Sequence, residues 1–172
     1  MIDVLILGVL RNGPVHGYEL KRRVERPALR PLSNNSLYPL LRRFEQAGAV
    51  TKRVEPTEGR PPRNIYELTD EGQALFHRLI TTLTPEQAAQ DESFLLRVGY
   101  FADMSAPERT TLLDARDAAL ASQEAQAREL LASVNDQQGW RTVTMAHLLQ
   151  RLAHDRAFVS ELRRAVAAGG PQ

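Results

Sequence analysis

Two short strands separated by a turn occupy the middle of the sequence. Residues 50–55 and residues 64–69 each alternate imperfectly between apolar and polar side chains, as half-buried strands do. The intervening residues 56–63 contain three prolines and a glycine, a composition that predicts a turn. The sequence therefore predicts a β-hairpin with a basic tip, and the fold must accommodate this hairpin within a largely helical chain.

Two helical segments are expected near the N-terminus. The first covers about Ile2–Leu10 and ends where residues 11–14, Arg-Asn-Gly-Pro, favour a turn. The second opens near Gly17 and ends at a loop that is bracketed by Pro27 and Pro31. The side chains of this second helix that we expect to face a core are Tyr18, Leu20 and Val24.

A third helix, just before the hairpin, has clear start and end signals. Residues 33–36, Ser-Asn-Asn-Ser, all suit the N-cap position, and Gly48 suits the left-handed position that follows a helix. Its apolar positions at helical spacing are Leu37, Leu40, Leu41 and Phe44. Pro39 leaves two alternatives, because its missing N–H is tolerated only in the first turn: the helix starts near Ser36, or it kinks against Asn35.

The chain beyond the hairpin is expected to be helical. Residues 69–72 cap a fourth helix that reaches about Leu83. After the break at residues 84–86, Thr-Pro-Glu, the sequence predicts three helices and no strand, the first with an apolar face running from Phe94 to Ala102.

The second of these C-terminal helices is expected to be long. Residues 105–108, Ser-Ala-Pro-Glu, form a capping box that opens a helix of about thirty residues. Its apolar residues at every seventh position are Leu113, Leu120, Ala127 and Val134. Such spacing favours helix pairing, either within the chain or between two copies of it.

The two halves of the chain differ in charge. Residues 1–83 hold 13 Lys and Arg against 9 Asp and Glu, a net +4, whereas residues 84–172 hold 9 against 12, a net −3. We therefore expect a DNA-binding domain in residues 1–83, because cations must replace the counterions on DNA phosphates, and a helical dimerisation domain in residues 84–172. The predicted fold class is mainly α with a β wing: an N-terminal winged helix-turn-helix followed by an all-helical domain.

The composition narrows the function classes. The chain has no cysteine, so it has neither disulfides nor thiolate metal sites. It contains no stretch apolar enough to span a bilayer, and Asp3 stands where a secretory leader would carry Lys or Arg, so the cytoplasm is the expected location. The four histidines are scattered, and no glycine-rich phosphate loop is present; we expect neither a metal, nor a cofactor, nor an enzyme.

Short polar residues opening the third helix and basic residues of the hairpin are the candidate DNA contacts. An α-helix fits the major groove, where Asn can pair with adenine, while Ser, Tyr and Arg hold phosphates. Arg60, between Gly59 and Pro61, is expected at an exposed tip. The candidate DNA-binding residues are Ser33, Asn34, Asn35, Ser36, Tyr38, Arg42, Arg43, Lys52, Arg53, Arg60 and Arg63. Helix capping and ordinary solvation are the competing interpretations of several of them.

Several segments of the first half resemble the PadR-type transcriptional regulators. The segments that carry the resemblance are Leu7-Gly8-Val9-Leu10, residues 13–20 (Gly-Pro-Val-His-Gly-Tyr-Glu-Leu), residues 36–45 (Ser-Leu-Tyr-Pro-Leu-Leu-Arg-Arg-Phe-Glu), Gly59-Arg60-Pro61 and residues 66–72 (Tyr-Glu-Leu-Thr-Asp-Glu-Gly). The resemblance covers about residues 4–80, and the C-terminal half resembles the longer-tailed branch of the family less specifically. Asn35 stands where the family often has Gly, and Pro62 is a second proline in the hairpin.

This resemblance implies a homodimeric repressor that binds a palindromic DNA operator and leaves it when a small ligand binds. Members of the family are known as sensors of phenolic acids or hydrophobic drugs, so a small aromatic or hydrophobic effector is expected here. The candidate effector-binding residues are Phe94, Arg97, Tyr100, Phe101, Trp140 and Phe158, for which ordinary core packing is the competing interpretation. The rival to DNA binding is a winged helix that docks a protein and binds no DNA.

Overall fold

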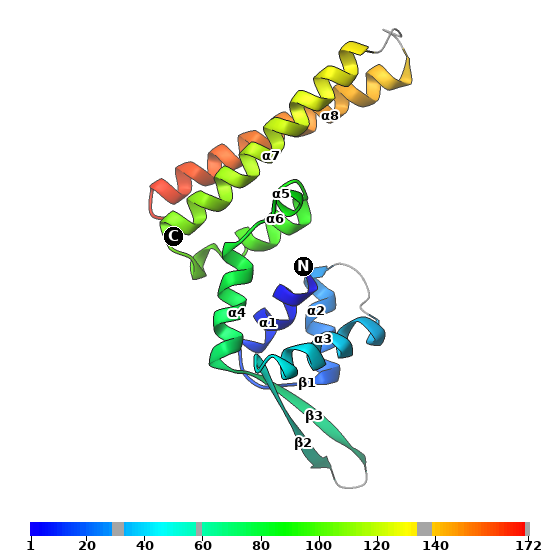
Figure 1. Cartoon of the computed structure of the whole chain (residues 1–172), viewed down its shortest axis with the longest axis vertical. Helices are drawn as coiled ribbons and strands as arrows, with labels where there is room; N and C mark the ends of the chain where they lie inside the picture. The colour runs from blue at the N-terminus through cyan, green and yellow to red at the C-terminus, as the bar shows by residue number, and fades with distance from the viewer. Residues whose placement is uncertain (29–32, 58–59, 134–138, 171–172) are drawn as a thin grey trace. The chain divides into compact units, whose positions relative to one another are not determined.

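The structure, a computed structural model, describes residues 1–28, 33–57, 60–133 and 139–170 (Figure 1). The chain forms two compact units, Met1–Ile80 and Thr81–Gln172. The first contains helices and a small sheet, and the described part of the second contains helices alone. The predicted fold class, a winged helix-turn-helix followed by a helical region, is confirmed.

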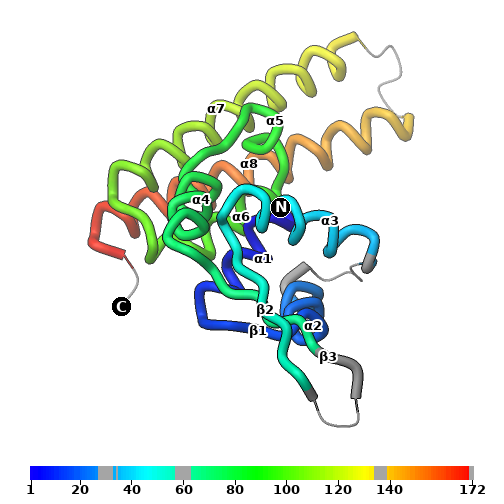
Figure 2. The backbone as a smooth tube through the Cα atoms, turned by 60° about the horizontal axis from the view of Figure 1, so that its bottom comes forward, coloured from blue at the N-terminus to red at the C-terminus, as the bar shows by residue number. Residues whose placement is uncertain are grey.

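The first unit places four helices around an antiparallel sheet. Its elements in chain order are α1 (Ile2–Leu10), β1 (Val15–His16), α2 (Gly17–Ala28), α3 (Asn34–Gln46), β2 (Val50–Thr57), β3 (Arg60–Leu68) and α4 (Asp70–Thr81, whose last residue falls in the second unit). The three strands lie in the order β1-β3-β2. Figures 1 and 2 both show the β2–β3 hairpin extending beyond the helices of this unit.

The core of the first unit is formed by apolar faces of its helices and by β3. Its most deeply buried side chains include Ile6, Leu7, Leu20, Leu37, Leu41, Phe44 and Ile80. The polar link between α3 and α4 is Thr69, whose Oγ1 donates to the Gly48 carbonyl at 2.6 Å and accepts from the Gly72 N–H at 3.0 Å. Thr69 thus caps α4, as the sequence predicts, and ties it to the end of α3.

The second unit is built on two long helices that run side by side (Figures 1 and 2). Its elements are α5 (Pro85–Ala88), α6 (Asp91–Val98), a 3-10 turn (Phe101–Asp103), α7 (Ala106–Ser133) and α8 (Trp140–Ala167). The expected capping box opens α7: the Ser105 N–H donates to Glu108 Oε2 at 2.7 Å, and the Glu108 N–H donates to Ser105 Oγ at 3.4 Å.

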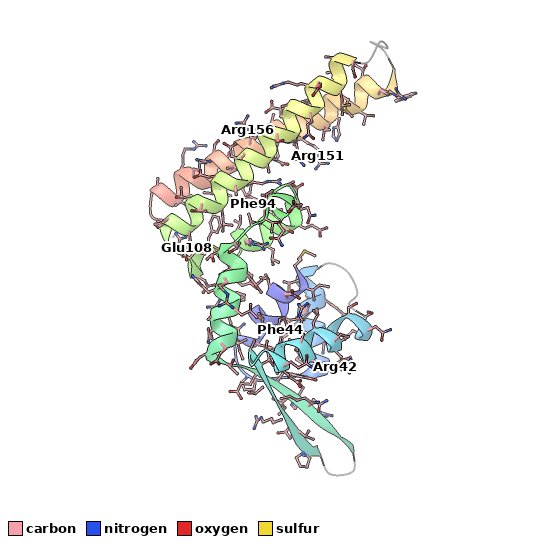
Figure 3. All side chains as sticks on the ribbon, in the orientation of Figure 1. Arg42, Phe44, Phe94, Glu108, Arg151 and Arg156 are labelled. Carbon is pink, nitrogen blue, oxygen red and sulfur yellow. The ribbon has the colours of Figure 1, made fainter. Side chains whose placement is uncertain are left out.

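The seam between α7 and α8 is apolar inside and ionic at its edge. Phe94 of α6 completes a buried cluster with Leu113, Leu120, Ala127, Leu152 and Val159. At the edge, Arg156 of α8 (Figure 3) donates to Asp117 at 3.0 Å and to Glu124 at 3.0 Å, both on α7. The seven-residue spacing therefore builds a seam within the chain; Val134, its last predicted member, lies outside the described residues.

Three expectations about the secondary structure need correction. Strand β1 was not predicted, because two residues are too short for a periodic signal. The hairpin strands extend into the predicted turn, since Pro56 falls at a register irregularity between Glu55 and Thr57, where no ladder N–H is needed. The first predicted C-terminal helix is divided, because Thr84 and Gln87 cap α5 as a separate turn and Gln90 is extended.

The structure decides between the two alternatives for α3, which begins at Asn34 with Ser33 as its N-cap and not near Ser36. Pro39 therefore lies inside the helix, and the Asn35 carbonyl cannot receive the usual N–H from that position.

No helix among the described residues is both long and apolar enough to cross a membrane.

Candidate nucleic-acid interface

The N-terminus of α3 is capped by its own serines. The Oγ of Ser33 accepts a hydrogen bond from the Ser36 N–H at 3.1 Å, and the two hydroxyl oxygens are 2.8 Å apart. Because Ser33 performs the capping, the exposed side chain of Asn35 is not needed for it. The side chain of Asn34, also a candidate, lies outside the described residues.

The outer face of α3 carries two candidates one helical turn apart. Tyr38 is 36% exposed and Arg42 is exposed, whereas Phe44 is buried. Figure 3 labels Phe44 on the side of α3 toward α1 and Arg42 on the other side. Beneath this face lies the buried Tyr66 of β3, and burial raises the pKa of its hydroxyl, which stays neutral. The outer face of α3 is thus fixed over the sheet.

Arg43, the neighbour of Arg42, makes its contacts within the first unit. Its Nη2 lies 3.1 Å from Asp3 Oδ2 of α1, and its guanidinium carbon lies 5.7 Å from the centre of the Phe44 ring. The structure therefore places the two arginines in different environments, although the sequence grouped them as DNA contacts.

The hairpin presents its cations on two opposite faces. The register pairs Lys52 with Tyr66 and Arg53 with Ile65, and neighbouring residues of a strand point to opposite sides. Arg63 is paired with Glu55, two positions along from the Arg53–Ile65 pair, so Arg53 and Arg63 share one face. Lys52 lies on the other face with Tyr66. The side chain of Arg60 and the turn at residues 58–59 lie outside the described residues.

Basic side chains of the first unit divide into paired and unpaired groups. On α2, Lys21 lies 3.8 Å from Glu25, while Arg22 and Arg23 lie 3.6 and 2.9 Å from Glu19. Among the described residues, the candidate cations without a carboxylate partner are Arg42, Lys52, Arg53 and Arg63, and all four are exposed. Four of the predicted DNA contacts are therefore cations that the described part of the unit leaves unneutralised.

A hollow of about 510 Å³ brings Tyr38 of α3 and Arg63 of β3 together. It is lined by His16, Gly17, Tyr18, Glu19, Tyr38, Arg63 and Asn64. Gly17 permits this close packing, since a Cβ there would lie 3.2 Å from the Tyr66 ring and 3.6 Å from the Tyr38 hydroxyl. At one edge, His16 Nε2 lies 3.6 Å from Glu55 Oε2 of β2.

Sequence reasoning missed Tyr18 as a surface residue. Tyr18 is 74% exposed, whereas Leu20 is fully buried, so the expectation that both face a core is wrong. Residues two apart on a helix point about 200° apart, which is why they cannot share a buried face. That spacing was the signal in the sequence that could have placed Tyr18 outside.

The six candidate effector residues occupy dissimilar environments in the second unit. Trp140 is 86% exposed at the start of α8, whereas Phe94 is 2% exposed, in the core. Phe101 and Phe158 pack partly buried against that same core, and Tyr100 is half-buried. These side chains line neither of two hollows that we find on the described part of this unit, of about 260 and 560 Å³.

Arg97, the expected partner for an anionic effector, is engaged by the protein itself. It is 2% exposed and donates to the Thr82 carbonyl at 3.0 Å, the Ser93 carbonyl at 2.8 Å and Gln87 Oε1 at 3.1 Å. Burial lowers its pKa from the ordinary arginine value. These hydrogen bonds connect α6, which carries Arg97, to α5 and to Thr82, the residue that follows α4.

Comparison with known proteins identifies the first unit. Residues 6–78 match the model of the transcriptional regulator PadR-like family. The negative transcriptional regulator PadR of Bacillus subtilis is 24% identical over 176 residues, which cover 97% of this chain and 96% of that protein. An uncharacterized 37.1 kDa protein in a transposon of Streptomyces fradiae is 29% identical over 122 residues, 67% of this chain and 34% of that protein.

Among solved structures, Bacillus subtilis PadR in complex with operator DNA aligns with 96% of this chain and 98% of its own, at 16% identity and a TM-score of 0.46. The match of residues 6–78 to the family model confirms, over those residues, the family resemblance seen in the sequence. Residues 6–78 of this chain are a domain of the PadR-like family of transcriptional regulators.

Proposed function

We propose that this chain is a transcriptional regulator that binds double-stranded DNA through α3 and the β2–β3 hairpin. The observation that carries the proposal is the set of exposed, unpaired cations around the polar face of α3: Arg42, Lys52, Arg53 and Arg63. A cation that no carboxylate neutralises can replace a condensed counterion on DNA, and this exchange drives binding. The family match over residues 6–78 supports the same function.

Each part of the surface has its own task in this proposal. The first turn of α3 enters the major groove, where Asn35 reads a base edge and Ser36 approaches the backbone. Tyr38 and Arg42, on the outer face of the helix, contact phosphates. Asn34, Arg43 and Arg60 remain candidates from the sequence, of which Arg43 is the weakest because Asp3 already neutralises it.

The regulator acts as a homodimer on a palindromic operator. Two copies of α3 enter successive major grooves about 34 Å apart, so that neither half-site suffices alone. Self-association through the helical unit is supported by the exposed apolar side chains Leu130, Trp140 and Val143 of α7 and α8. Sedimentation velocity should give a dimer, and a monomer that binds half-site and palindrome equally well would contradict this part of the proposal.

Occupancy of the operator represses transcription, and a small aromatic or hydrophobic effector releases the protein. A hollow of about 260 Å³ beside α7 and α8 supports a small ligand in the second unit, since leucines and the polar side chains of Asp91, Arg151 and Asp155 share its walls. Such a ligand acts by changing the spacing of the two α3 helices.

The test is a measurement of DNA affinity at several salt concentrations. Fragments selected from the source genome by the purified chain supply the operator, and fluorescence anisotropy gives its Kd. The double substitution Arg53→Ala and Arg63→Ala should weaken binding and flatten the salt slope by about 3.6, since the dimer loses four phosphate contacts and each contributes about 0.9.

The matched control for this test is Arg22→Ala with Arg23→Ala. It removes the same charge from arginines that are paired with Glu19, and it should leave the slope nearly unchanged. If the hairpin variant binds selected DNA as the unmodified chain does, the proposal is wrong, and a winged helix that docks a protein becomes the better explanation.

A further inference from the structure

The hollow beside α3 is built from four separate elements of the first unit. His16 ends β1, Gly17, Tyr18 and Glu19 open α2, Tyr38 comes from α3, and Arg63 and Asn64 come from β3. The hollow therefore lies where β1, α2, α3 and the β2–β3 hairpin meet. A ligand bound at such a junction contacts all of these elements, so its affinity depends on how they are placed relative to one another.

The walls of this hollow are rich in groups that donate hydrogen bonds. Arg63 offers a guanidinium, Tyr18 and Tyr38 offer hydroxyls, and Asn64 offers an amide. Among the described residues, Arg63 has no carboxylate partner, and Tyr18 is 74% exposed. An exposed aromatic ring and an unpaired arginine at one concave site favour an anionic ligand that is seated from outside.

One acidic group of the hollow, Glu19, is already neutralised, and Glu55 at its edge faces a histidine that is charged only when protonated. Glu19 lies between Arg22 and Arg23, and the hydrogen bond from Arg23 lowers the pKa of its carboxyl. Glu55 lies 3.6 Å from His16 Nε2 at the other edge. Arg63 forms no ion pair among the described residues, although Glu55 is its cross-strand neighbour, and the site therefore favours an anion.

We propose that this hollow seats one phosphate of the DNA backbone, with Arg63 supplying the charge and Tyr18 and Tyr38 donating hydroxyl hydrogen bonds. This inference rests on the proposed DNA binding and adds Tyr18, a residue of α2, to the contacts expected on α3 and the hairpin. A volume of about 510 Å³ accommodates a phosphodiester together with parts of its neighbouring sugars. A phosphate bound here fixes the positions of α2, α3 and the hairpin relative to the DNA duplex.

The experiment replaces operator phosphates one at a time by neutral methylphosphonates. With the unmodified chain, replacement at the seated position in each half-site should weaken binding about tenfold, the worth of one charge-assisted hydrogen bond. In Tyr18→Phe and in Arg63→Ala, overall affinity should fall by a similar factor, and replacement of that same phosphate should then have little further effect. Because both side chains are exposed, we expect both variants to fold, and circular dichroism checks this.

Arg53→Ala is the matched control, because Arg53 shares the hairpin face with Arg63 but does not line the hollow. It should leave the sensitivity at the seated phosphate intact. Tyr18→Phe and Arg63→Ala could bind DNA more weakly and still lose the same affinity when that phosphate is replaced by a methylphosphonate. In that case the proposed phosphate site is wrong, while the proposed DNA binding stands. If the unmodified chain binds no genomic fragment at low salt, the proposed function itself fails.

Discussion

Arg43 of α3 forms an ion pair with Asp3 of α1, with Nη2 3.1 Å from Oδ2, while its neighbour Arg42 has no carboxylate partner in the described part of the chain. Consecutive residues on a helix point about 100° apart, so the two guanidinium groups cannot serve the same surface. One arginine fastens α3 to the N-terminal helix, and the other is available to a ligand outside.

The Arg42–Arg43 pair gives a first prediction in which each variant controls the other. Arg42→Ala should weaken operator binding and flatten the salt slope by about two, because the dimer loses two phosphate contacts. Arg43→Ala should leave the slope unchanged and lower the free energy of unfolding by only about 0.2–1 kcal/mol, the usual worth of an exposed ion pair. Anisotropy titrations and urea unfolding measure the two quantities. A larger slope change for Arg43→Ala would reverse the assignment.

The first unit was largely predictable because local signals agree with the fold. The N-cap serine of α3, Gly48 after its end and the hairpin strands all appear in the sequence and are confirmed. Gly48 adopts a φ of 71°, as its position requires. What the sequence could not supply was the side-chain environment: nothing local distinguishes Arg42 from Arg43, because Asp3 lies forty positions away.

The candidate site in the second unit was predicted less well for a related reason. Aromatic residues and an arginine in one helical region were grouped by residue type, and type does not determine burial. Arg97 is held by three protein acceptors, and Trp140 lies in solvent. Helix pairing followed from the seven-residue spacing, but that spacing alone left open whether the partner was the same chain or a second copy.

Gly72 gives a second prediction, about stability. A Cβ at this position would overlap the carbonyl oxygen of Ala49 and the Leu68 side chain, so backbone must move to make room. Gly72→Ala should therefore destabilise the first unit by about 1–3 kcal/mol or more, the usual result of overpacking. The exposed neighbour Gln73→Ala should stay within about 0.5 kcal/mol of the unmodified chain. Urea unfolding followed by circular dichroism measures both, and equal stability of the two variants would contradict the predicted overlap.

Arg97 gives a third prediction, which separates a structural arginine from a ligand-binding one. Arg97→Met leaves the carbonyls of Thr82 and Ser93 without their donor, so the free energy of unfolding should fall by about 2–4 kcal/mol. The exposed Arg164→Ala should change it by less than about 0.5 kcal/mol. A stable Arg97→Met variant that had lost only its response to an effector would instead support the ligand-binding role.

The pKa of Glu19 gives a fourth prediction, a dependence of stability on pH. The hydrogen bond from Arg23, with the nearby Arg22, lowers the folded-state pKa of this carboxyl below its ordinary value of 4.5. A lowered pKa means that the contribution is complete above the unfolded-state value and is lost as the pH falls through the folded-state value. Glu19→Gln should therefore be less stable than the unmodified chain near pH 6, and the difference should shrink as the pH falls below about 4.5. Thermal unfolding from pH 6 to pH 3 measures it, and a difference independent of pH would contradict the charge-based cause.

The buried Arg116 gives the last prediction, an asymmetry between the partners of one ion pair. Its side chain is 3% exposed, contacts the 44%-exposed Asp91, lies 3.6 Å from Asp155 and donates to the Ala88 carbonyl at 2.8 Å. If Arg116 is replaced by Met, water can solvate the carboxylates, and the apolar side chain can pack against Phe94, over which the guanidinium now lies. If Asp91 is replaced by Ala, the guanidinium stays charged and buried, and Asp155, at 3.6 Å, is the carboxylate that remains beside it.

Because a buried charge that loses a carboxylate partner costs more than a half-exposed carboxylate that loses its arginine, Asp91→Ala should lower the free energy of unfolding by up to about 3–5 kcal/mol and Arg116→Met by less. The double variant Arg116→Met with Asp91→Ala should be more stable than Asp91→Ala alone, since it removes the stranded charge. Urea unfolding of the three variants gives the free energies. If Arg116→Met were the more damaging single substitution, the ion pair would be contributing net stability, and the desolvation of the guanidinium would not be the dominant energy at this junction of α5, α6, α7 and α8.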